Sequence, residues 1–201
     1  MLAYGRRASC GPERPLADEL VTIWLSACGA RFGPVLQLPE VSRHAATRTD
    51  ILLVCSTGGH LLQLVALRES WQRYSRAWVT FDKSDARSLL ESEHVYFAHG
   101  PTNRSIKNTL RNIVVAWRVV GEIRPKVVLT TGAGVAVPFA WIARLRGATV
   151  VYVESLARIE GPSLTYRLIA PIAKRRYVQW PELAEALPGS RFVGNVFSAD
   201  A

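Results

Sequence analysis

Short apolar runs alternate with segments of helical periodicity from Ile51 to the end of the chain. Apolar runs of this length between turn residues are typical of buried strands, and their alternation with helices is typical of a parallel sheet covered on both faces. The sequence therefore predicts an α/β fold, a single Rossmann-like doubly wound parallel sheet. The expected strands are 51–55, 77–81, 94–98, 127–131, 149–153, 176–179 and 191–194, and the main expected helices are 60–71, 104–123, 135–146, 163–174 and 182–187.

The first 50 residues have a different character. Four prolines interrupt them, and they show no sustained periodicity beyond the stretch ELVTIWL. A chain of 201 residues has room for one domain and a tail. We expect residues 1–50 to be a poorly ordered N-terminal extension and residues 51–201 to be one Rossmann-like domain.

The chain shows no targeting or membrane-spanning segment by its pattern. MLAYGRRASCGPERP leads into no apolar region of the kind found in signal peptides. The longest uncharged run, 127–143, is broken by TTGAG and by Pro138, so it reads as strand, loop and helix rather than as a membrane span. Three scattered cysteines are too few for a disulfide framework or a zinc site, which favours a reducing compartment.

The net charge of +9 is concentrated in one part of the chain. Between Arg104 and Arg176 there are 13 basic and 3 acidic residues. Such an excess predicts an anionic partner, which could be nucleic acid, a phosphorylated ligand or an acidic membrane surface. Nucleic acid is not expected, because the sequence has neither an aromatic-interleaved basic strand nor a helix-turn-helix signature.

Ligands of doubly wound sheets bind at the carboxyl ends of the strands, which directs attention to the loops there. The loop STGGH at 56–60 separates a strand from a helix. Its glycines let backbone N–H groups approach a ligand, and the helix N-terminus behind them favours an anionic group. His60 could orient that ligand or accept a proton from it. The alternative is a sharp turn followed by ordinary first-turn residues.

The expected helix 104–123 has two distinct sides. Four basic residues lie on one narrow stripe at helical spacing, and four apolar residues fall on the opposite side. The stripe is either a solvated charged face or a contact with an anionic surface. The basic residues are Arg104, Lys107, Arg111 and Arg118, and the apolar residues are Ile106, Leu110, Ile113 and Trp117.

A partial dinucleotide fingerprint follows the strand at 127–131. Gly132 and Gly134 are followed by Glu154 at the end of the next strand, a spacing that suits an acid that binds a ribose. Against this interpretation, Val137 occupies the third fingerprint position and the unit is not the first strand–helix turn of the domain. A nicotinamide-dependent oxidoreductase is therefore an alternative. P-loop, GxSxG and HExxH patterns are absent.

The sequence resembles the family of the asparagine-linked-glycosylation subunit fourteen, which includes bacterial capsule and exopolysaccharide biosynthesis proteins. The resemblance covers roughly 51–197, with the elements in the family's order. The matching elements are STGGH at 56–60, NRS at 103–105, RPKVVLTTGAGVAVPF at 124–139, YVES at 152–155, PSLT at 162–165 and VQWPEL at 178–183.

This resemblance implies the N-terminal, acceptor-side half of a GT-B glycosyltransferase. The nucleotide sugar would be bound by a second small GT-B half chain, and the enzyme would be a hexosyltransferase that is active only with this partner. The implied reaction is inverting and needs no metal or other cofactor. It moves a sugar from a UDP-sugar to a lipid-diphosphate-linked saccharide in polysaccharide biosynthesis.

The resemblance also implies roles for individual residues. His60 would be the general base, with Glu154 as the rival base or as a brace of the following loop. Three residues near the C-terminus, Gln179, Trp180 and Pro181, would lie near the partner interface. The acceptor and its phosphates would be bound by Ser56, Thr57, Gly58, Gly59, Asn103, Arg104, Gly132, Ala133, Gly134 and Arg158.

The same resemblance places the chain at a membrane. Lys107, Arg111 and Arg118 would face an anionic surface, and the protein would attach peripherally to the cytoplasmic face without a transmembrane span. A second alternative is a non-catalytic membrane adaptor that recruits a transferase and contributes no chemical group.

Overall fold

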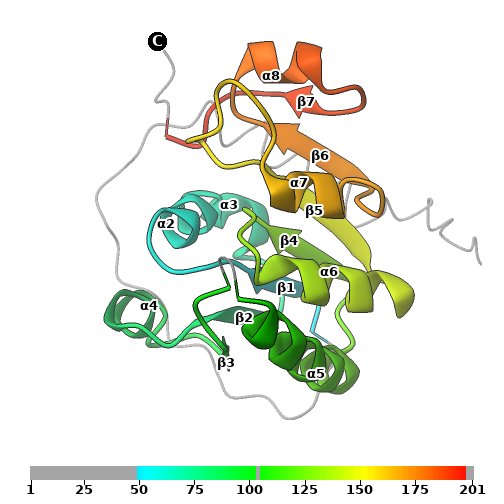
Figure 1. Cartoon of the computed structure of the whole chain (residues 1–201). Coiled ribbons are helices and arrows are strands. Elements are labelled where there is room, and N and C mark those ends of the chain that lie inside the picture. The colour runs from blue at the N-terminus through cyan, green and yellow to red at the C-terminus, as the bar shows by residue number, and fades with distance from the viewer. Residues whose placement is uncertain (1–48, 103–104, 198–201) are drawn as a thin grey trace, which may run out of the picture.

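A computed structural model describes residues 49–102 and 105–197 of the chain. Its seven strands form one parallel sheet in the order β3-β2-β1-β4-β5-β6-β7, as Figure 1 shows. All seven expected strands are present, which confirms the predicted parallel α/β fold. The strands are β1 (Ile51–Val54), β2 (Arg76–Phe81), β3 (Val95–Ala98), β4 (Val127–Thr130), β5 (Thr149–Val153), β6 (Arg175–Val178) and β7 (Arg191–Phe192).

The helices follow the expected segments with shifted ends. The expected helix 60–71 is divided in two at Leu67, whose backbone leaves helical geometry. The helix expected to begin at 104 begins at Ile106, because the Ser105 side chain caps it by accepting the N–H of Asn108 at 3.3 Å. The helices are α2 (Gly59–Ala66), α3 (Arg68–Trp71), α4 (Ser84–Leu89), α5 (Ile106–Ile123), α6 (Ala136–Leu145), α7 (Leu164–Ile169) and α8 (Pro181–Ala186).

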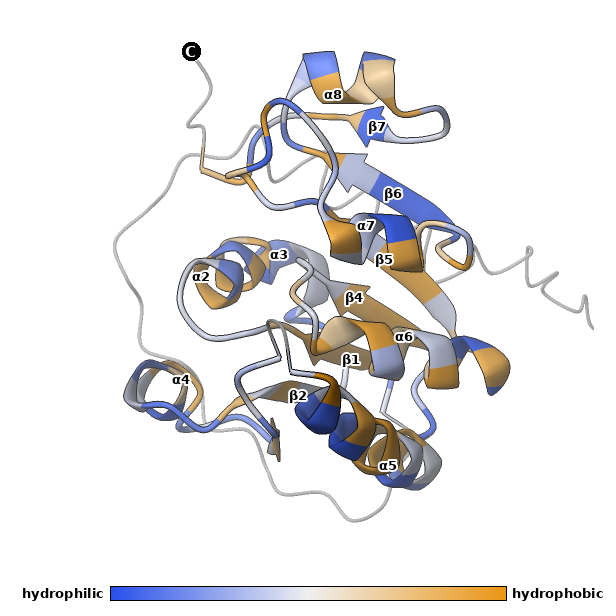
Figure 2. Ribbon diagram, in the orientation of Figure 1, coloured by the Kyte–Doolittle hydropathy of each residue, from blue (hydrophilic) through white to orange (hydrophobic). Residues whose placement is uncertain are grey.

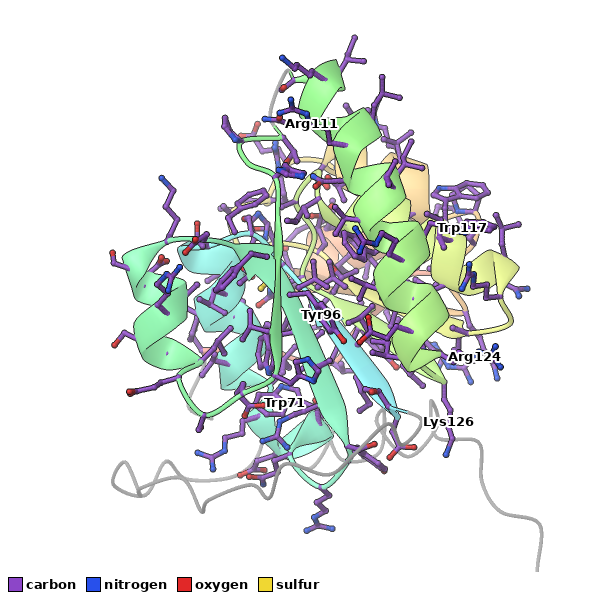
Figure 3. The ribbon with its side chains drawn as sticks, turned by 90° about the horizontal axis from the view of Figure 1, so that it is seen from below. Trp71, Tyr96, Arg111, Trp117, Arg124 and Lys126 are labelled. Atoms are coloured by element: carbon purple, nitrogen blue, oxygen red, sulfur yellow. The ribbon has the colours of Figure 1, made fainter. Side chains whose placement is uncertain are left out.

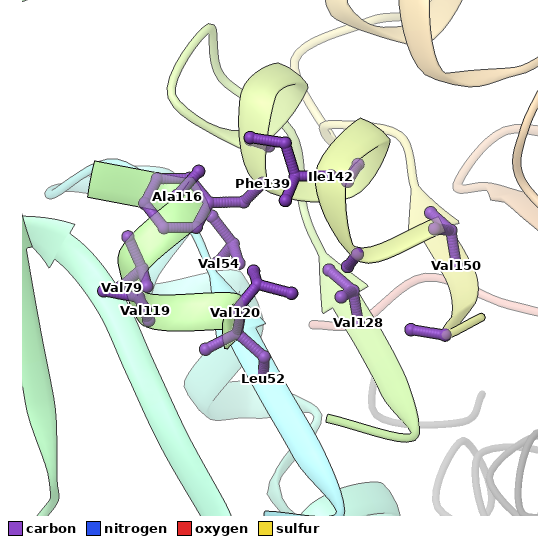
Figure 4. Close-up of a cluster of buried hydrophobic side chains, with 14 of the residues drawn as sticks. Leu52, Val54, Val79, Ala116, Val119, Val120, Val128, Phe139, Ile142 and Val150 are labelled. Carbon is purple, nitrogen blue, oxygen red and sulfur yellow. The ribbon is translucent and has the colours of Figure 1, made fainter. Parts of the chain in front are cut away.

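The sheet is buried on both faces, as the alternating residues of β1 show. Leu52 and Val54 belong to a core cluster with α5, α6 and α7 (Figure 4), whereas Ile51 and Leu53 belong to a cluster with α2 and α3. Every residue of β1 and β4 is buried, and apart from Thr130 at the end of β4 these strands are apolar throughout rather than alternating (Figure 2).

The strand order reverses between β1 and β4. The chain runs from β1 outward to β2 and β3, and then returns to place β4 on the other side of β1. At such a switch point, the loops after the two central strands lead in opposite directions and leave a crevice between them. The loops that follow β1 and β4 are the predicted STGGH and TTGAG segments.

Two expectations about the whole chain concern a membrane-spanning helix and the N-terminal extension. Among the residues that the structure describes, no helix combines the length and hydropathy needed to cross a membrane. Residues 1–48 lie outside the described residues, so the division into an extension and a domain at residue 50 stays a prediction.

Candidate active site

A cleft of about 1270 Å³ opens at the switch point, at the carboxyl ends of the strands. Loops that follow β1, β2, β3, β4 and β5 contribute to its walls. The cleft brings together seven of the residues predicted to act in catalysis or to bind the acceptor, which come from three separate loops. They are Ser56, Thr57, His60, Ala133, Gly134, Glu154 and Arg158.

His60 is held by two reciprocal hydrogen bonds to the end of β4. Its Nδ1 lies 2.8 Å from the carbonyl oxygen of Thr131, and the Thr131 hydroxyl donates to the His60 carbonyl oxygen at 2.8 Å. A carbonyl oxygen can only accept, so Nδ1 must carry the proton of the neutral ring. The other ring nitrogen, Nε2, then has a free lone pair and can accept a proton at the cleft.

The environment of His60 favours the neutral ring. Burial lowers the pKa of His60 below its usual value of 6.5. The hydrogen bond to Thr131 and the negative charge of Glu154 act in the opposite direction, and the positive charge of Arg158 lowers the pKa further. A neutral imidazole near pH 7 is the state that a general base requires.

Glu154, the alternative candidate for the general base, holds the loop that follows it through internal hydrogen bonds. Its carboxylate is 1 % exposed, and its Oε1 accepts the N–H of Ser155 at 2.8 Å and the hydroxyl of Tyr152 at 3.2 Å. Its Oε2 accepts the N–H of Ser163 at 2.9 Å. Glu154 therefore closes the loop 154–163, and its oxygens are already engaged as acceptors. This arrangement also disfavours the dinucleotide alternative, in which the same carboxylate would bind a ribose.

The glycine-rich loop differs from the expected phosphate cradle. The N–H of Gly58 donates at 2.8 Å to a carboxylate oxygen of Asp85, which lies on α4. This carboxylate supplies the negative charge that helix α2 lacks in its own first turn. A second anion at this amide would meet the charge of Asp85, so the amide that was expected to bind a phosphate is already occupied in this structure. Ser56 and Thr57 line the cleft, whereas Gly58 and Gly59 lie beside it.

The second glycine loop keeps the expected form of a backbone cradle. Gly132 and Ala133 both have positive φ, 100° and 70°, and an alanine rarely adopts that conformation. The turn leads directly to the start of α6, where backbone N–H groups and the helix dipole favour an anion. Ala133 and Gly134 line the cleft; Gly132 is held behind them by donating its N–H to the Thr130 hydroxyl at 2.9 Å.

Positive side chains surround the cleft. Arg158 lies on its wall as predicted, whereas Arg111 also lines the cleft although we expected it to face a membrane. Lys83 and His99 were not predicted as site residues; they follow β2 and β3, and a position directly after an expected strand is the signal that could have found them. The acid at this rim, Asp82, is paired with Arg87 at 2.6 Å. The cleft therefore suits an anionic ligand.

Asn103 and Arg104, which we expected to bind the acceptor, lie outside the described residues. The chain on either side of them is anchored. Asn112, a fully buried residue of α5, holds both backbone groups of His99, and Asn108 donates to the carbonyl of Pro101 at 2.8 Å. Thr102, before the two residues, and Asn108, after them, line the cleft.

Helix α5 has three faces rather than the two that the pattern predicted. The face that packs on the sheet contains Asn112, Ala116, Val119, Val120 and Ile123. The predicted apolar side is exposed instead: Trp117 is 58 % exposed and stacks on the guanidinium of Arg146 at 4.3 Å. In Figure 3, Arg111 and Trp117 project from different sides of the helix. Lys107 and Arg118 are exposed, as predicted for the basic stripe.

The residues predicted near the partner interface separate into an interior and a surface group. Gln179 is 1 % exposed and is surrounded by internal hydrogen-bond partners, so its side chain is not available to a partner chain. Trp180 is half-buried and donates through Nε1 to the Leu156 carbonyl at 2.7 Å. Pro181 is exposed at the start of α8. We therefore no longer place Gln179 at the interface.

Residues 49–102 and 105–197 contain neither a metal site nor a reactive cysteine. No group of three or more His, Cys, Asp or Glu side chains there could hold a metal ion. Cys55 is buried in the core beside β1, and burial raises the pKa of its thiol to about 12, so it is not a nucleophile at neutral pH. That the reaction needs no metal or cofactor stays a prediction.

Comparison with known proteins identifies related sequences. Residues 98–196 match the family model described as "Oligosaccharide biosynthesis protein Alg14 like". The UDP-N-acetylglucosamine transferase subunit ALG14 of Rattus norvegicus is 29 % identical, over 88 % of this chain and 98 % of that protein. A UDP-N-acetylglucosamine–N-acetylmuramyl-(pentapeptide) pyrophosphoryl-undecaprenol N-acetylglucosamine transferase of Salinibacter ruber is 30 % identical, over 74 % of this chain and 44 % of that protein.

Solved structures with the same fold are about twice as long as the matched region. MurG of Acinetobacter baumannii superposes with a TM-score of 0.60 at 20 % identity, over 76 % of this chain and 47 % of that one. UDP-N-acetylglucosamine 2-epimerase of Rickettsia bellii has a TM-score of 0.58 at 15 % identity, over 75 % and 46 %. The chain thus has a GT-B-like Rossmann fold and spans just under half of each of these structures.

Proposed function

Because this chain belongs to the Alg14-like family of oligosaccharide biosynthesis proteins, we propose that it is the acceptor-binding subunit of a UDP-sugar transferase. The acceptor is a lipid-diphosphate-linked saccharide, and the reaction is inverting. The observation that supports this proposal most strongly is the position of His60. Its proton is fixed on Nδ1 by Thr131, and its free Nε2 belongs to a positively lined cleft at the switch point of the sheet.

In the proposed mechanism, His60 is the general base. Its Nε2 takes the proton of the acceptor hydroxyl as the hydroxyl oxygen attacks the anomeric carbon of the donor sugar. The bond between that carbon and the UDP oxygen breaks, and UDP leaves with the electron pair. The imidazolium that forms is stabilised by the hydrogen bond to Thr131 and by the charge of Glu154.

The acceptor diphosphate is assigned to the second glycine loop. The left-handed turn at Gly132 and Ala133 and the start of α6 provide backbone donors there. Arg158 and Arg111 line the same cleft and can form charge-assisted hydrogen bonds with phosphate oxygens. Since these groups provide a base and anion ligands, the proposed reaction runs without a resident cofactor or metal, which transfer in the presence of EDTA tests.

The donor sugar is assigned to a second chain. This chain matches nearly the full length of the rat transferase subunit but under half of MurG and of the bacterial transferase. A GT-B enzyme needs two facing domains, so the partner would be a second small GT-B half. The names of the relatives favour N-acetylglucosamine as the sugar; capsule or exopolysaccharide biosynthesis is the proposed pathway class.

Peripheral attachment to the cytoplasmic face of a membrane completes the proposal. Exposed apolar side chains on α5 lie beside the basic residues Lys107 and Arg118. Apolar side chains can enter the interfacial region of a bilayer, and each cation near an anionic surface contributes about 1 kcal/mol. The exposed apolar residues of α5 are Ile106, Leu110, Ile113, Val114 and Trp117.

The test is co-expression of this chain with a candidate half-transferase partner, followed by a UDP-release assay on membranes with a panel of UDP-sugars. We expect turnover only when both chains are present, and the active donor identifies the sugar. A stable complex that releases no UDP with any donor, on membranes that contain the acceptor, would favour the non-catalytic adaptor instead. UDP release by either chain alone would contradict the two-subunit proposal.

A further inference from the structure

Two buried glutamines connect the helix of His60 to the opposite wall of the cleft. Gln63 lies one turn after His60 on α2, and its side chain is 5 % exposed. Its Oε1 accepts the N–H of Leu156 at 2.9 Å, and its Nε2 donates to the carbonyl of Gly59 at 3.1 Å. Gln63 thus binds both the residue before His60 and the loop that contains Arg158.

Gln179, the first residue after β6, completes this connection. Its Nε2 donates to Gln63 Oε1 at 2.7 Å and to the carbonyl of Glu154 at 2.9 Å. Its Oε1 accepts the N–H of Val196, in the C-terminal segment, at 3.1 Å. One side chain therefore joins α2, the end of β5 and the C-terminal segment.

The partners fix the orientation of both amides. The N–H groups of Val196 and Leu156 can only donate, and the carbonyls of Glu154 and Gly59 can only accept. Neither amide can be flipped without placing oxygen against oxygen or N–H against N–H. In a buried site such mismatches are costly, because water does not replace the lost bonds. The pair thus specifies one arrangement of the two cleft walls.

We propose that Gln179 is a positioning residue, which acts through Gln63 to hold His60 and the Arg158 loop at a fixed separation across the cleft. The inference rests on the proposed function, because it is His60 acting as the base that makes this separation matter. Since Gln179 also binds the N–H of Val196, the arrangement depends on the C-terminal segment as well.

The hydrogen-bond pattern predicts which substitution disturbs the site more. In a Gln179→Glu variant, the carboxylate can still accept from Val196, but its second oxygen faces the two acceptors that Nε2 now satisfies. In a Gln63→Glu variant, both donors to Oε1 are kept and the carboxylate meets a single acceptor, the Gly59 carbonyl. Gln179→Glu is therefore the stronger perturbation, although both changes conserve the side-chain shape.

The first measurement uses the full chain alone and requires no activity. NMR spectra record the amide signals of Gly59 and Leu156 and the imidazole signals of His60 in the wild type and in the two variants. Gln72→Glu is the matched control, because it makes the same chemical change on an exposed side chain. We expect Gln179→Glu to move all three sets of signals, Gln63→Glu to move them less, and Gln72→Glu to leave them in place.

The second measurement is turnover in the co-expressed complex, per folded subunit. A misplacement of about 1 Å can cost about 100-fold in rate, so we expect kcat to fall by roughly 10- to 100-fold in Gln179→Glu. The KM for the UDP-sugar should not change, because the partner binds the donor. A residue that only stabilised the fold would lower the melting temperature and leave the His60 signals and kcat per folded subunit unchanged.

A failure of the inference about Gln179 can be distinguished from a failure of the proposed function. If the wild-type complex transfers no sugar, the proposed function fails, while the NMR spectra still report whether Gln179 positions His60. If Gln179→Glu folds and the His60 signals match those of the wild type, the inference is overturned. Should Gln179→Glu not fold, Gln179→Met removes the same hydrogen bonds to Gln63 and Glu154 without adding a charge, and unchanged His60 signals in that variant overturn the inference equally.

Discussion

A His60→Asn substitution separates the base from the structural role of this side chain. The amide nitrogen of asparagine, like Nδ1, is bonded to Cγ and can donate to the Thr131 carbonyl in its place, so the anchor of the loop is kept. What disappears is the lone pair of Nε2. General base catalysis typically contributes about 100- to 10,000-fold, or roughly 3–5 kcal/mol of barrier. We therefore expect kcat to fall by that factor, with little change in the melting temperature.

The pH dependence of the rate and of the stability provides a second test of His60 as the base. Burial lowers the pKa of His60 below 6.5, so the wild-type base stays neutral at pH 6.5 and loses activity only as the pH falls further. The unfolded chain binds this proton more readily than the folded chain does. The free energy of unfolding therefore decreases as the pH falls below about 6.5. In His60→Asn, both the acidic limb of the rate profile and this part of the stability loss should disappear.

The assay is UDP release by the co-expressed complex over a pH series, normalised to folded subunit, with melting temperatures measured in parallel. A His60→Asn complex that retains its rate within about threefold would refute the assignment of His60 as base. A slow variant that keeps the wild-type acidic limb would show that His60 does not cause that limb.

Substitutions at four further positions test separate parts of the structure. Asp85→Ala removes the cap of Gly58 and should destabilise the chain by about 1 kcal/mol in chemical denaturation, whereas Asp85→Asn keeps an acceptor and should cost less. Phe139→Ala empties a fully buried position and should cost about 3–5 kcal/mol in the same assay. Glu154→Gln places an amide donor against one of the N–H groups that the carboxylate now accepts, and should cost about 1–3 kcal/mol. Trp117→Glu should weaken sedimentation with anionic vesicles and leave the melting temperature nearly unchanged; equal binding would argue against α5 as the membrane contact.

The fold was predictable because its signals are local. A buried parallel strand is a short apolar run, and seven such runs separated by turns and helical segments leave few alternatives to a doubly wound sheet. The cleft was predictable for the same reason, because strand ends are visible in sequence and ligands of this architecture bind there. This reasoning located His60 and the loop at Gly132–Gly134, but it missed Lys83 and His99 although they occupy the same kind of position.

The individual roles were less predictable, because they depend on contacts between residues distant in sequence. The sequence cannot show that Asp85 occupies the amide of Gly58, 27 positions away, or that Gln179 binds Gln63 across 116 positions. The sequence VQWPEL is the same whether its glutamine faces a partner or the interior of the chain. Periodicity likewise divides α5 into polar and apolar sides but does not say which apolar side packs on the sheet.

These long-range contacts also explain how the proposed base, His60, is held on the first turn of a short helix. Helix α2 has only eight residues, begins at a glycine and has no acid of its own in its first turn, so it would be marginal in isolation. Asp85 caps it from α4, Thr131 holds His60 from β4, and Gln63 ties it to the β5 loop and Gln179. The position of His60 is thus set by three other elements rather than by its own helix. A change at any of the three contacts should therefore alter the chemistry of the cleft before it unfolds the sheet.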